Sequence, residues 1–436
     1  MLNYYLKLAW LSSKKTWGMS LLMVLAIGLG IGAAMTTVTV NYLMSANPIP
    51  DKSDQLYYVQ LDSWDPNNAF FDNGDPPDQL TYRDATALMA AKRATRQVVM
   101  AGMSGVIEPK DKEALPFIVT GRASSADFFP MFNVPFLYGT GWDAEADSKQ
   151  ELVVVINAEL NERLFGGRDS TGQLLRLAGK DFRITGVMAR WNPKPKFYDL
   201  TSGAFEDVEE VFVPFSLIAT EMIERSGNTN CWKPGGAGFQ AFLDSECIWT
   251  QMWVELPSQA DREAYQGFID AYALEQHKFG RFARTNNNKL SDVMTWLEQR
   301  QVVSDDASMM MAMAFMFLLV CLLNTVGLLL AKFLGKAGEI GVRQALGASR
   351  RDLFLQHLVE SGLIGFAGGL LGLMLAWLGL QAIQTMYGDW MRDLATLDGT
   401  MVLLAIVLAI VSSILAGLYP TWRACQIQPS QQLKAQ

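Results

Sequence analysis

The feature that most constrains the fold is a set of four long apolar stretches in a chain of 436 residues. A helix needs roughly 20 mostly apolar residues to cross a bilayer, because its backbone N–H and C=O groups must all be satisfied internally. The stretches of this length are Trp17–Leu43, Ser308–Ala331, Leu353–Ile383 and Thr400–Tyr419. One could be a buried helix of a soluble protein, but four are too many for that interpretation. We therefore predict an integral membrane protein with four transmembrane helices.

A large water-soluble domain is expected between the first and second stretches. The chain is 18% charged, below the roughly one quarter that is usual for soluble proteins. The deficit is uneven, because segment 45–305 carries 25 basic and 37 acidic residues. This is the composition of an acidic soluble domain. The predicted fold class is an α-helical membrane protein with a large mixed α/β domain inserted between transmembrane helices 1 and 2.

The predicted order of segments follows from this division. It comprises an N-terminal segment 1–16, a first span 17–43, the inserted core domain with its stem 44–307, a second span 308–331, a basic segment 332–352, a third span 353–383, a short loop 384–399, a fourth span 400–419 and a tail 420–436. Met44-Ser45-Ala46 loosely resembles the cleavage site of a signal peptide. The apolar run before it is longer than the roughly 7–15 residues of a signal-peptide core, so we expect a retained anchor.

The charges of the short segments predict the orientation, because cytoplasmic loops carry an excess of Lys and Arg. Basic residues precede the first span, fill the segment between the second and third, and follow the fourth; they are Lys7, Lys14, Lys15, Lys332, Lys336, Arg343, Arg350, Arg351, Arg423 and Lys434. The loop between the third and fourth spans holds Asp389, Asp393 and Asp398 against Arg392. We expect a multi-pass protein of the inner membrane, with both termini cytoplasmic and the large domain periplasmic.

Glycines at a spacing of four mark two of the spans. They are Gly28 and Gly32 in the first span, and the overlapping pairs Gly365–Gly369 and Gly368–Gly372 in the third. Such spacing lets helix backbones approach closely in lipid. Glycine is also simply frequent in membrane helices, but the doubled pattern favours a helix contact.

Strand and helix patterns alternate in the inserted domain. Strands are expected at Leu56–Leu61, Gln97–Met100, Glu151–Ile156, Gln173–Leu177, Asp181–Val187 and Cys247–Leu256. Asn157 is a suitable N-cap for a helix that reaches Phe165 before Gly166-Gly167, and Ser258 opens a helix to about Lys278. A polar helical segment at about Lys289–Asp306 is expected to lead directly into the second span as a stem.

Three irregular stretches, 62–78, 191–210 and 227–238, are expected to be loops. The third contains Cys231, and Cys247 follows it in a compartment that is oxidising if the orientation is correct. A disulfide between these cysteines would stabilise the domain by about 3 kcal/mol in the chain-entropy model. The sequence leaves both the bonded and the free state open.

The sequence offers no constellation of catalytic, cofactor-binding or metal-binding residues. Gly335-Lys336 is followed by Ala337 rather than Ser or Thr and lacks the upstream glycine of a phosphate-binding loop. His277 is the one histidine of the inserted domain, and it lies among Glu275, Gln276 and Lys278 as a surface residue would. A pI near 5.0 without a basic stripe argues against nucleic-acid binding.

The most informative run extends from Gly338 to Asp352, in the basic segment after the second span. Glu339 and Arg343 form an i, i+4 pair in the favourable order for a helix. Ile340, Val342 and Leu346 supply apolar contacts, Gly347 suits a helix stop, and Ser349 suits the cap of the next helix; these assignments follow from the sequence order. The run predicts a short interfacial helix, available either to a partner or to anionic lipid.

Continuing through Gln356, Glu360 and Gly365–Gly372, this run closely resembles the signature of MacB/FtsX-type permeases, the membrane subunits of type VII ABC transporters. Further segments resemble that family at the end of the chain (Pro420, Arg423-Ala424, Pro429 and Leu433) and in the inserted domain (Gly121-Arg122, Leu164-Phe165-Gly166 and Ile184–Val187). The three irregular stretches depart from the family pattern.

The resemblance implies a mechanical role. The short helix would be the coupling helix that a separate ATPase binds, through Glu339, Ile340, Val342, Arg343, Leu346, Gly347 and Ser349. Glu339 and Arg343 would be its polar anchors. ATP and Mg would be bound by that partner, so this chain is expected to hold no cofactor and to be no enzyme. A second copy or a sister permease would pack against the glycine-rich spans.

The leading functional prediction is an efflux or extrusion permease that transmits ATP-driven motion to its periplasmic domain. Export across two membranes would add a periplasmic adaptor and an outer-membrane channel as partners. The alternative is an FtsX-like signalling subunit that regulates a periplasmic hydrolase or sensor without transport. An anchored periplasmic enzyme is disfavoured by the scarcity of histidine and by the cytoplasmic helix.

Overall fold

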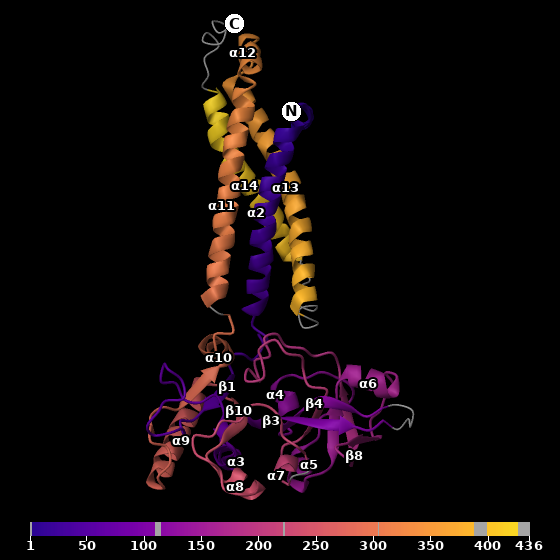
Figure 1. Cartoon of the computed structure of the whole chain (residues 1–436), viewed down its shortest axis with the longest axis vertical. Helices are drawn as coiled ribbons and strands as arrows, with labels where there is room; N and C mark the ends of the chain where they lie inside the picture. Colours follow the sequence, from indigo (N-terminus) through magenta and orange to yellow (C-terminus); the bar gives the residue numbers. More distant parts are fainter. Residues whose placement is uncertain (1, 110–114, 221–222, 304, 388–398, 426–436) are drawn as a thin grey trace. The chain divides into compact units, whose positions relative to one another are not determined.

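The computed structural model describes residues 2–109, 115–220, 223–303, 305–387 and 399–425. The chain divides into two compact units. We call Met1–Ser45 with Val303–Gln436 the membrane unit, and Ala46–Val302 the head (Figure 1). The acidic residues Asp389, Asp393 and Asp398 and the tail residues Pro429 and Leu433 lie outside the described residues.

The membrane unit consists of long helices. They are α1 (Leu2–Lys15), α2 (Trp17–Met44), α11 (Asp305–Leu334), α12 (Ala337–Ala345), α13 (Arg350–Tyr387) and α14 (Gly399–Cys425). Within the described residues, four helical stretches are long and apolar enough to cross a membrane: Trp17–Tyr42, Ala307–Leu334, Arg350–Ile383 and Ala405–Arg423. The prediction of four transmembrane helices, with the α/β domain between the first and the second, is confirmed.

Close backbone contacts place α13 between α2 and α14. A Cβ added to Gly372 would lie 2.9 Å from Ile31 Cβ of α2 and 3.2 Å from the Gly28 carbonyl oxygen. On another face of α13, a Cβ on Gly369 would lie 2.6 Å from Ala409 Cβ of α14. The two overlapping glycine pairs of α13 therefore serve different neighbours.

The remaining glycines of the predicted set lie at the same two seams. Gly32 of α2 faces Leu375, Gly368 faces Ile27, and Gly365 faces Ser413 of α14. The expected helix contact exists, but it forms within one chain. Helices of the same chain occupy the space beside these glycines, and the expected packing of a second permease copy against these spans stays a prediction.

The head is built on a mixed sheet. The described strands are β1 (Leu56–Gln60), β2 (Leu80–Thr81), β3 (Arg96–Ile107), β4 (Phe117–Ser124), β5 (Phe136–Gly139), β6 (Val153–Ile156), β7 (Leu174–Leu177), β8 (Lys180–Met188), β9 (Val211–Pro214), β10 (Ile248–Glu255) and β11 (Lys289–Asp292). Their order is β11-β1-β10-β3-β4-β9-β6-β8-β5, with β2 beside β10 and β7 beside β3 and β8. The pairs β4–β9 and β6–β8 are parallel, so the sheet is mixed. The predicted strands are confirmed.

Successive side chains along the strands belong alternately to two apolar cores. In β1, Tyr57 and Val59 belong to one core, and Leu56 and Tyr58 belong to the other. This follows from the two-residue period of a strand whose two faces are both covered. The head helices are α3 (Tyr82–Ala91), α4 (Phe128–Met131), α5 (Ala144–Lys149), α6 (Ala158–Phe165), α7 (Ser216–Ala219), α8 (Phe239–Leu243), α9 (Gln259–Lys278) and α10 (Val293–Gln299).

The local signals for head helices are confirmed. The Asn157 side chain accepts a hydrogen bond from the Leu160 amide (2.8 Å), and Gly166 ends α6 with φ +62°. Ser258 and Asp261 form the reciprocal capping box that starts α9. Each signal depends on residues within one turn, which explains why it can be found in the sequence alone.

The predicted helical stem is wrong. Lys289–Asp292 pairs with β1 as the antiparallel strand β11, and the Asp292 side chain then caps the short helix α10. Helix α10 ends at Gln299, Gln301 has a φ of +48°, and α11 begins only at Asp305. The polar pattern is compatible with a helix, but residues 289–292 pair with the free edge of β1 and form a strand instead.

Two of the irregular stretches are held by ion pairs, which are fully buried in one stretch and partly buried in the other. Arg122 of β4 is buried and pairs with Asp199 and, through Nε, with Glu209 at 2.9 Å, both from the stretch 191–210. Burial raises the pKa of Glu209, but the charges of Arg122 and Lys196 outweigh it and lower the value to about 2. Arg284 likewise holds Asp62 at 2.7 Å, at the start of the stretch 62–78.

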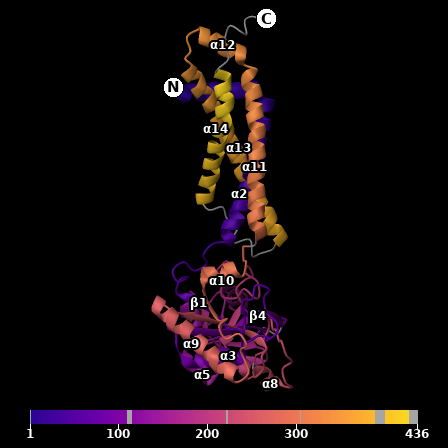
Figure 2. The ribbon, with the colours of Figure 1, turned by 90° about the vertical axis from the view of Figure 1, so that its left-hand side faces the viewer.

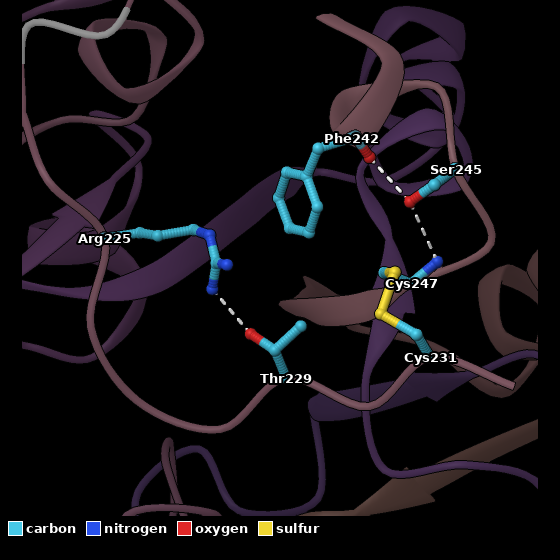
Figure 3. The surroundings of a disulfide bond; sticks show 6 residues. All are labelled: Arg225, Thr229, Cys231, Phe242, Ser245 and Cys247. Carbon is cyan, nitrogen blue, oxygen red and sulfur yellow. Dashed lines mark hydrogen bonds between the residues drawn. A yellow bond between two sulfur atoms is a disulfide. The ribbon is translucent and has the colours of Figure 1, made fainter. Parts of the chain in front are cut away.

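The third irregular stretch is closed by a disulfide between Cys231 and Cys247 (Figure 3). Cys247 donates its amide to Ser245 Oγ (3.1 Å), and Arg225 donates to Thr229 Oγ1 across the same loop (2.5 Å). The Arg225 guanidinium also lies over the Phe242 ring, 4.3 Å from its centroid. These contacts, together with the covalent bond, give this loop a defined place against β10.

Replacing Gly372 by Leu should destabilise the membrane unit by about 1–3 kcal/mol, because the new side chain would force α13 away from α2. Gly362→Leu is the matched control on the same helix, where an added Cβ meets nothing within 4 Å. Thermal unfolding of the full chain in detergent measures both variants. Equal melting temperatures for the two would contradict the assigned α2–α13 seam.

Candidate functional site

The short helix α12 is formed and ended by the residues that the sequence indicated. Arg343 Nη2 donates to Glu339 Oε1 at 2.7 Å, one turn away. Gly347 follows the helix with φ +97°, and the Ala348 amide donates back to the Arg343 carbonyl (3.0 Å). Ser349 Oγ accepts from the Asp352 amide (3.1 Å) and so caps α13. A tight turn therefore joins α12 to the third span.

The two sides of α12 differ in their surroundings. Ile340 is buried in the apolar core of the membrane unit, together with Phe333 and Leu353. Val342 is 60% exposed and Leu346 is 83% exposed. Of the three apolar residues predicted to contact a partner, Ile340 instead fixes the helix to its own chain. Val342 and Leu346 remain available to a partner.

The polar residues of α12 also bind their own chain. Arg343 Nη1 donates to Gln356 Oε1 of α13 at 3.0 Å, in addition to its bond with Glu339. About half of the Glu339 side chain is exposed, against about a third of that of Arg343. Arg343 thus positions α12 against α13, and Glu339 is the more accessible of the two predicted polar anchors.

Beside α12 lies a buried ionic cluster that joins three helices. Lys332 Nζ of α11 is 2.7 Å from Glu360 Oε1 of α13, and both side chains are at most 1% exposed. Ser12 of α1 donates to the same Glu360 oxygen, and Lys336 Nζ is 3.6 Å from it. We call Ser12, Lys332, Lys336 and Glu360 the ionic cluster. A buried charge is tolerated only when it is paired, so these contacts fix the relative positions of α1, α11 and α13.

His357 completes the surroundings of Glu360. Its ring packs on Phe333, with centroids 4.4 Å apart, and its Nδ1 lies 3.6 Å from Glu360 Oε2. His357 and Glu360 lie near the start of the predicted third span, and the structure buries both against α11. The available signal was an acid inside an otherwise apolar span, together with Lys332 at the end of the preceding span.

A cavity of about 250 Å³ opens between α1, α12 and α13. Its lining includes Lys15, Lys336 and Arg343 as well as Glu339 and Glu360. Among the described residues no group of three or more His, Cys, Asp and Glu side chains is placed to hold a metal ion. The arrangement has one exposed apolar patch, formed by Val342 and Leu346, and a buried network of charges on the side that faces the helix bundle.

Comparison with known proteins places these features in a wider context. The sequence model of the MacB-like periplasmic core domain matches residues 20–272, and that of the FtsX-like permease C-terminal domain matches residues 311–429. The macrolide export ATP-binding/permease protein MacB of Bdellovibrio bacteriovorus is 23% identical over 299 residues, which are 68% of this chain and 41% of that protein. The pyoverdine export ATP-binding/permease protein PvdT of Pseudomonas putida is 23% identical over 380 residues, 85% of this chain and 52% of that protein.

A solved structure shows a weaker likeness. The periplasmic region of MacB from Actinobacillus actinomycetemcomitans aligns with 58% of this chain and 94% of its own length, at 13% identity and a TM-score of 0.38. The chain spans about half the length, or less, of these two curated relatives.

Glu360→Gln should destabilise the membrane unit by about 3–5 kcal/mol, because it leaves the Lys332 ammonium buried without a counter-charge. Glu339→Gln, which breaks a partly exposed pair, should cost at most about 1 kcal/mol. The double variant Lys332→Met with Glu360→Met should recover most of the loss. Thermal unfolding in detergent decides, and a Glu360→Gln variant as stable as Glu339→Gln would show that the ionic cluster does not hold the helices together.

Proposed function

This chain belongs to the MacB/FtsX family of ABC transporter permeases, and on that premise we propose that it transmits the motion of a separate ATPase to its head, driving efflux or extrusion of a substrate. The ATPase binds ATP and Mg, and this chain holds neither. The transmission is mechanical: the ATPase displaces α12, the membrane helices follow, and the head responds on the other side of the bilayer.

The observation that carries this proposal is the unequal division of α12. Val342 and Leu346 project from the membrane unit with no covering element among the described residues, whereas Ile340 and Arg343 tie the same helix to α11 and α13. A partner that binds Val342 and Leu346 would therefore transmit its motion to α11 and α13, because α12 is attached to both helices. Lipid contact alone would require no such attachment to the helix bundle.

The proposed orientation puts α12 and both termini in the cytoplasm and the head in the periplasm. The basic residues of α1, of the α11–α13 connection and of the end of α14 support it, since the elements that carry them lie at one end of the membrane unit (Figure 1). Chain continuity then makes the link, because α2 enters the head at Ser45–Ala46 and the chain leaves the head again at Val302–Val303.

Export is favoured over signalling by the proteins that match both units of the chain. Their names describe export of macrolides and of pyoverdine. By analogy, a dimer with a second copy or a sister permease, a periplasmic adaptor and an outer-membrane channel are proposed partners. A relay subunit would instead act on a periplasmic hydrolase or sensor, and its loss would leave the efflux of every substrate unchanged.

Leu346→Asp should abolish co-purification of the ATPase, because it puts a charge at the centre of the apolar contact. Leu174→Asp is the matched control, since Leu174 is also exposed but lies on β7 of the head. Pull-down from membranes followed by mass spectrometry measures both. The coupling role of α12 is refuted if Leu346→Asp retains the ATPase as fully as Leu174→Asp, with both variants inserted in the membrane.

A further inference from the structure

The N-terminal helix α1 carries residues that the proposed function does not use. Helix α1 lies across the bundle at a steep angle to α2 (Figure 2). Trp10 of α1 is 65% exposed, and Trp17 at the start of α2 is 71% exposed. Tryptophan is enriched at the boundary between hydrocarbon and headgroups. These side chains therefore place α1 at the depth of the lipid headgroups.

A groove of about 440 Å³ lies along this face of α1, between α2 and α13. Its walls include Leu21 and Val24 of α2 and Ile364 and Ala367 of α13. This size is within the range of specific ligand sites, which are typically about 300–1,000 Å³. Apolar walls inside a membrane unit suit a hydrocarbon chain and reject a polar solute.

The part of the lining near the α1–α2 junction contains aromatic and basic side chains. Trp10, Lys14 and Trp17 belong to its lining, and none of the described residues that line it is acidic. The Lys14 ammonium is thus a cation without a carboxylate in the same lining, and in the sequence it lies four residues after Trp10 and three residues before Trp17. A ligand that fits carries a negative headgroup next to an apolar tail.

We propose that this groove is a binding site for one anionic glycerophospholipid of the leaflet at the α12 end of the membrane unit. An acyl chain lies between α2 and α13, and the phosphate accepts from Lys14 between the two tryptophans. The zwitterionic phospholipids of the same leaflet have the tail but no net charge, so they bind more weakly.

The site has a consequence for coupling, which rests on the proposed function. Ser12, one residue from the groove-lining Ser13, donates to Glu360 and accepts from Lys336 in the ionic cluster. A lipid under α1 therefore holds the helix that supplies Ser12 to this cluster. Loss of the lipid weakens the attachment of α1 to α11 and α13.

Native mass spectrometry of the purified full chain, titrated with phosphatidylglycerol or phosphatidylcholine, tests the site. Lys14→Gln should weaken phosphatidylglycerol binding about fivefold, since one lysine near an anionic lipid contributes about 1 kcal/mol. Lys7→Gln is the control of equal charge on the same helix, outside the groove lining, and should leave binding within twofold of the parent chain.

Ala367→Trp should remove saturable binding of both lipids, because Ala367 is an exposed residue of the lining and an indole there fills the groove. Leu21→Trp on the opposite wall is the second variant, used if Ala367→Trp does not purify as a folded chain. The headgroup assignment is overturned if Lys14→Gln binds like Lys7→Gln, or if both lipids bind equally to the parent chain. The groove assignment is overturned if a folded tryptophan variant still binds phosphatidylglycerol.

The titration contains no ATPase, so its outcome is separate from that of the ATPase pull-down. If lipid binds as described while Leu346→Asp retains the ATPase, the lipid site stands and the coupling role fails. If Leu346→Asp loses the ATPase but the parent chain does not bind lipid as described, the coupling role stands and the lipid site fails.

Discussion

The buried pair between Lys332 and Glu360 is the interaction on which the membrane unit depends. Two charges removed from water are tolerated only while they face each other, so the pair sets how α11 and α13 are rotated. With α13 in that rotation, Gly372 faces α2 and Gly369 faces α14. The glycine seams and the ionic cluster therefore specify the same arrangement by two independent means, one steric and one electrostatic.

This arrangement holds a helix of only nine residues in a fixed position, as the proposed coupling role of α12 requires. A helix that short has little stability of its own in water. Helix α12 is stabilised by Ile340, which packs in the core, and by the hydrogen bond from Arg343 to Gln356. The tight Schellman turn at Gly347 connects it directly to α13. What remains exposed is a small apolar patch whose position is fixed by the bundle behind it.

Much of this protein could be predicted from its sequence, and the successes share a cause. Span number, fold class, the cap at Asn157 and the stop at Gly347 all depend on residues close together in the chain. The failures depend on distant partners. Residues 289–292 form a strand because they pair with β1, which lies about 230 residues earlier in the chain. The spacing of Gly28 and Gly32 likewise predicts a close helix contact but does not show which helix makes it.

The ionic cluster was missed for the same reason. In the sequence, Lys332 is one of many basic residues at a membrane boundary, and Glu360 is part of the run that resembles the family signature. Only the fold brings them within 2.7 Å. Arg122 in the head is a similar case. The sequence identifies Gly121-Arg122 only as a segment that resembles the family, whereas in the structure Arg122 holds the stretch 191–210 through Asp199 and Glu209.

The central claim is that α12 moves as one body with the membrane helices. Nitroxide labels on Gly338→Cys in α12 and Leu323→Cys in α11, both at exposed positions outside the Val342 and Leu346 patch, test it directly in a Cys321→Ser, Cys425→Ser background with the ATPase bound. Double electron–electron resonance gives the distance between the labels with and without trapped ATP, and ATP hydrolysis by the same sample shows that the complex is active. We predict a distance distribution that nucleotide leaves unchanged. A shift of that distribution on ATP binding would show that α12 moves independently and would contradict this account.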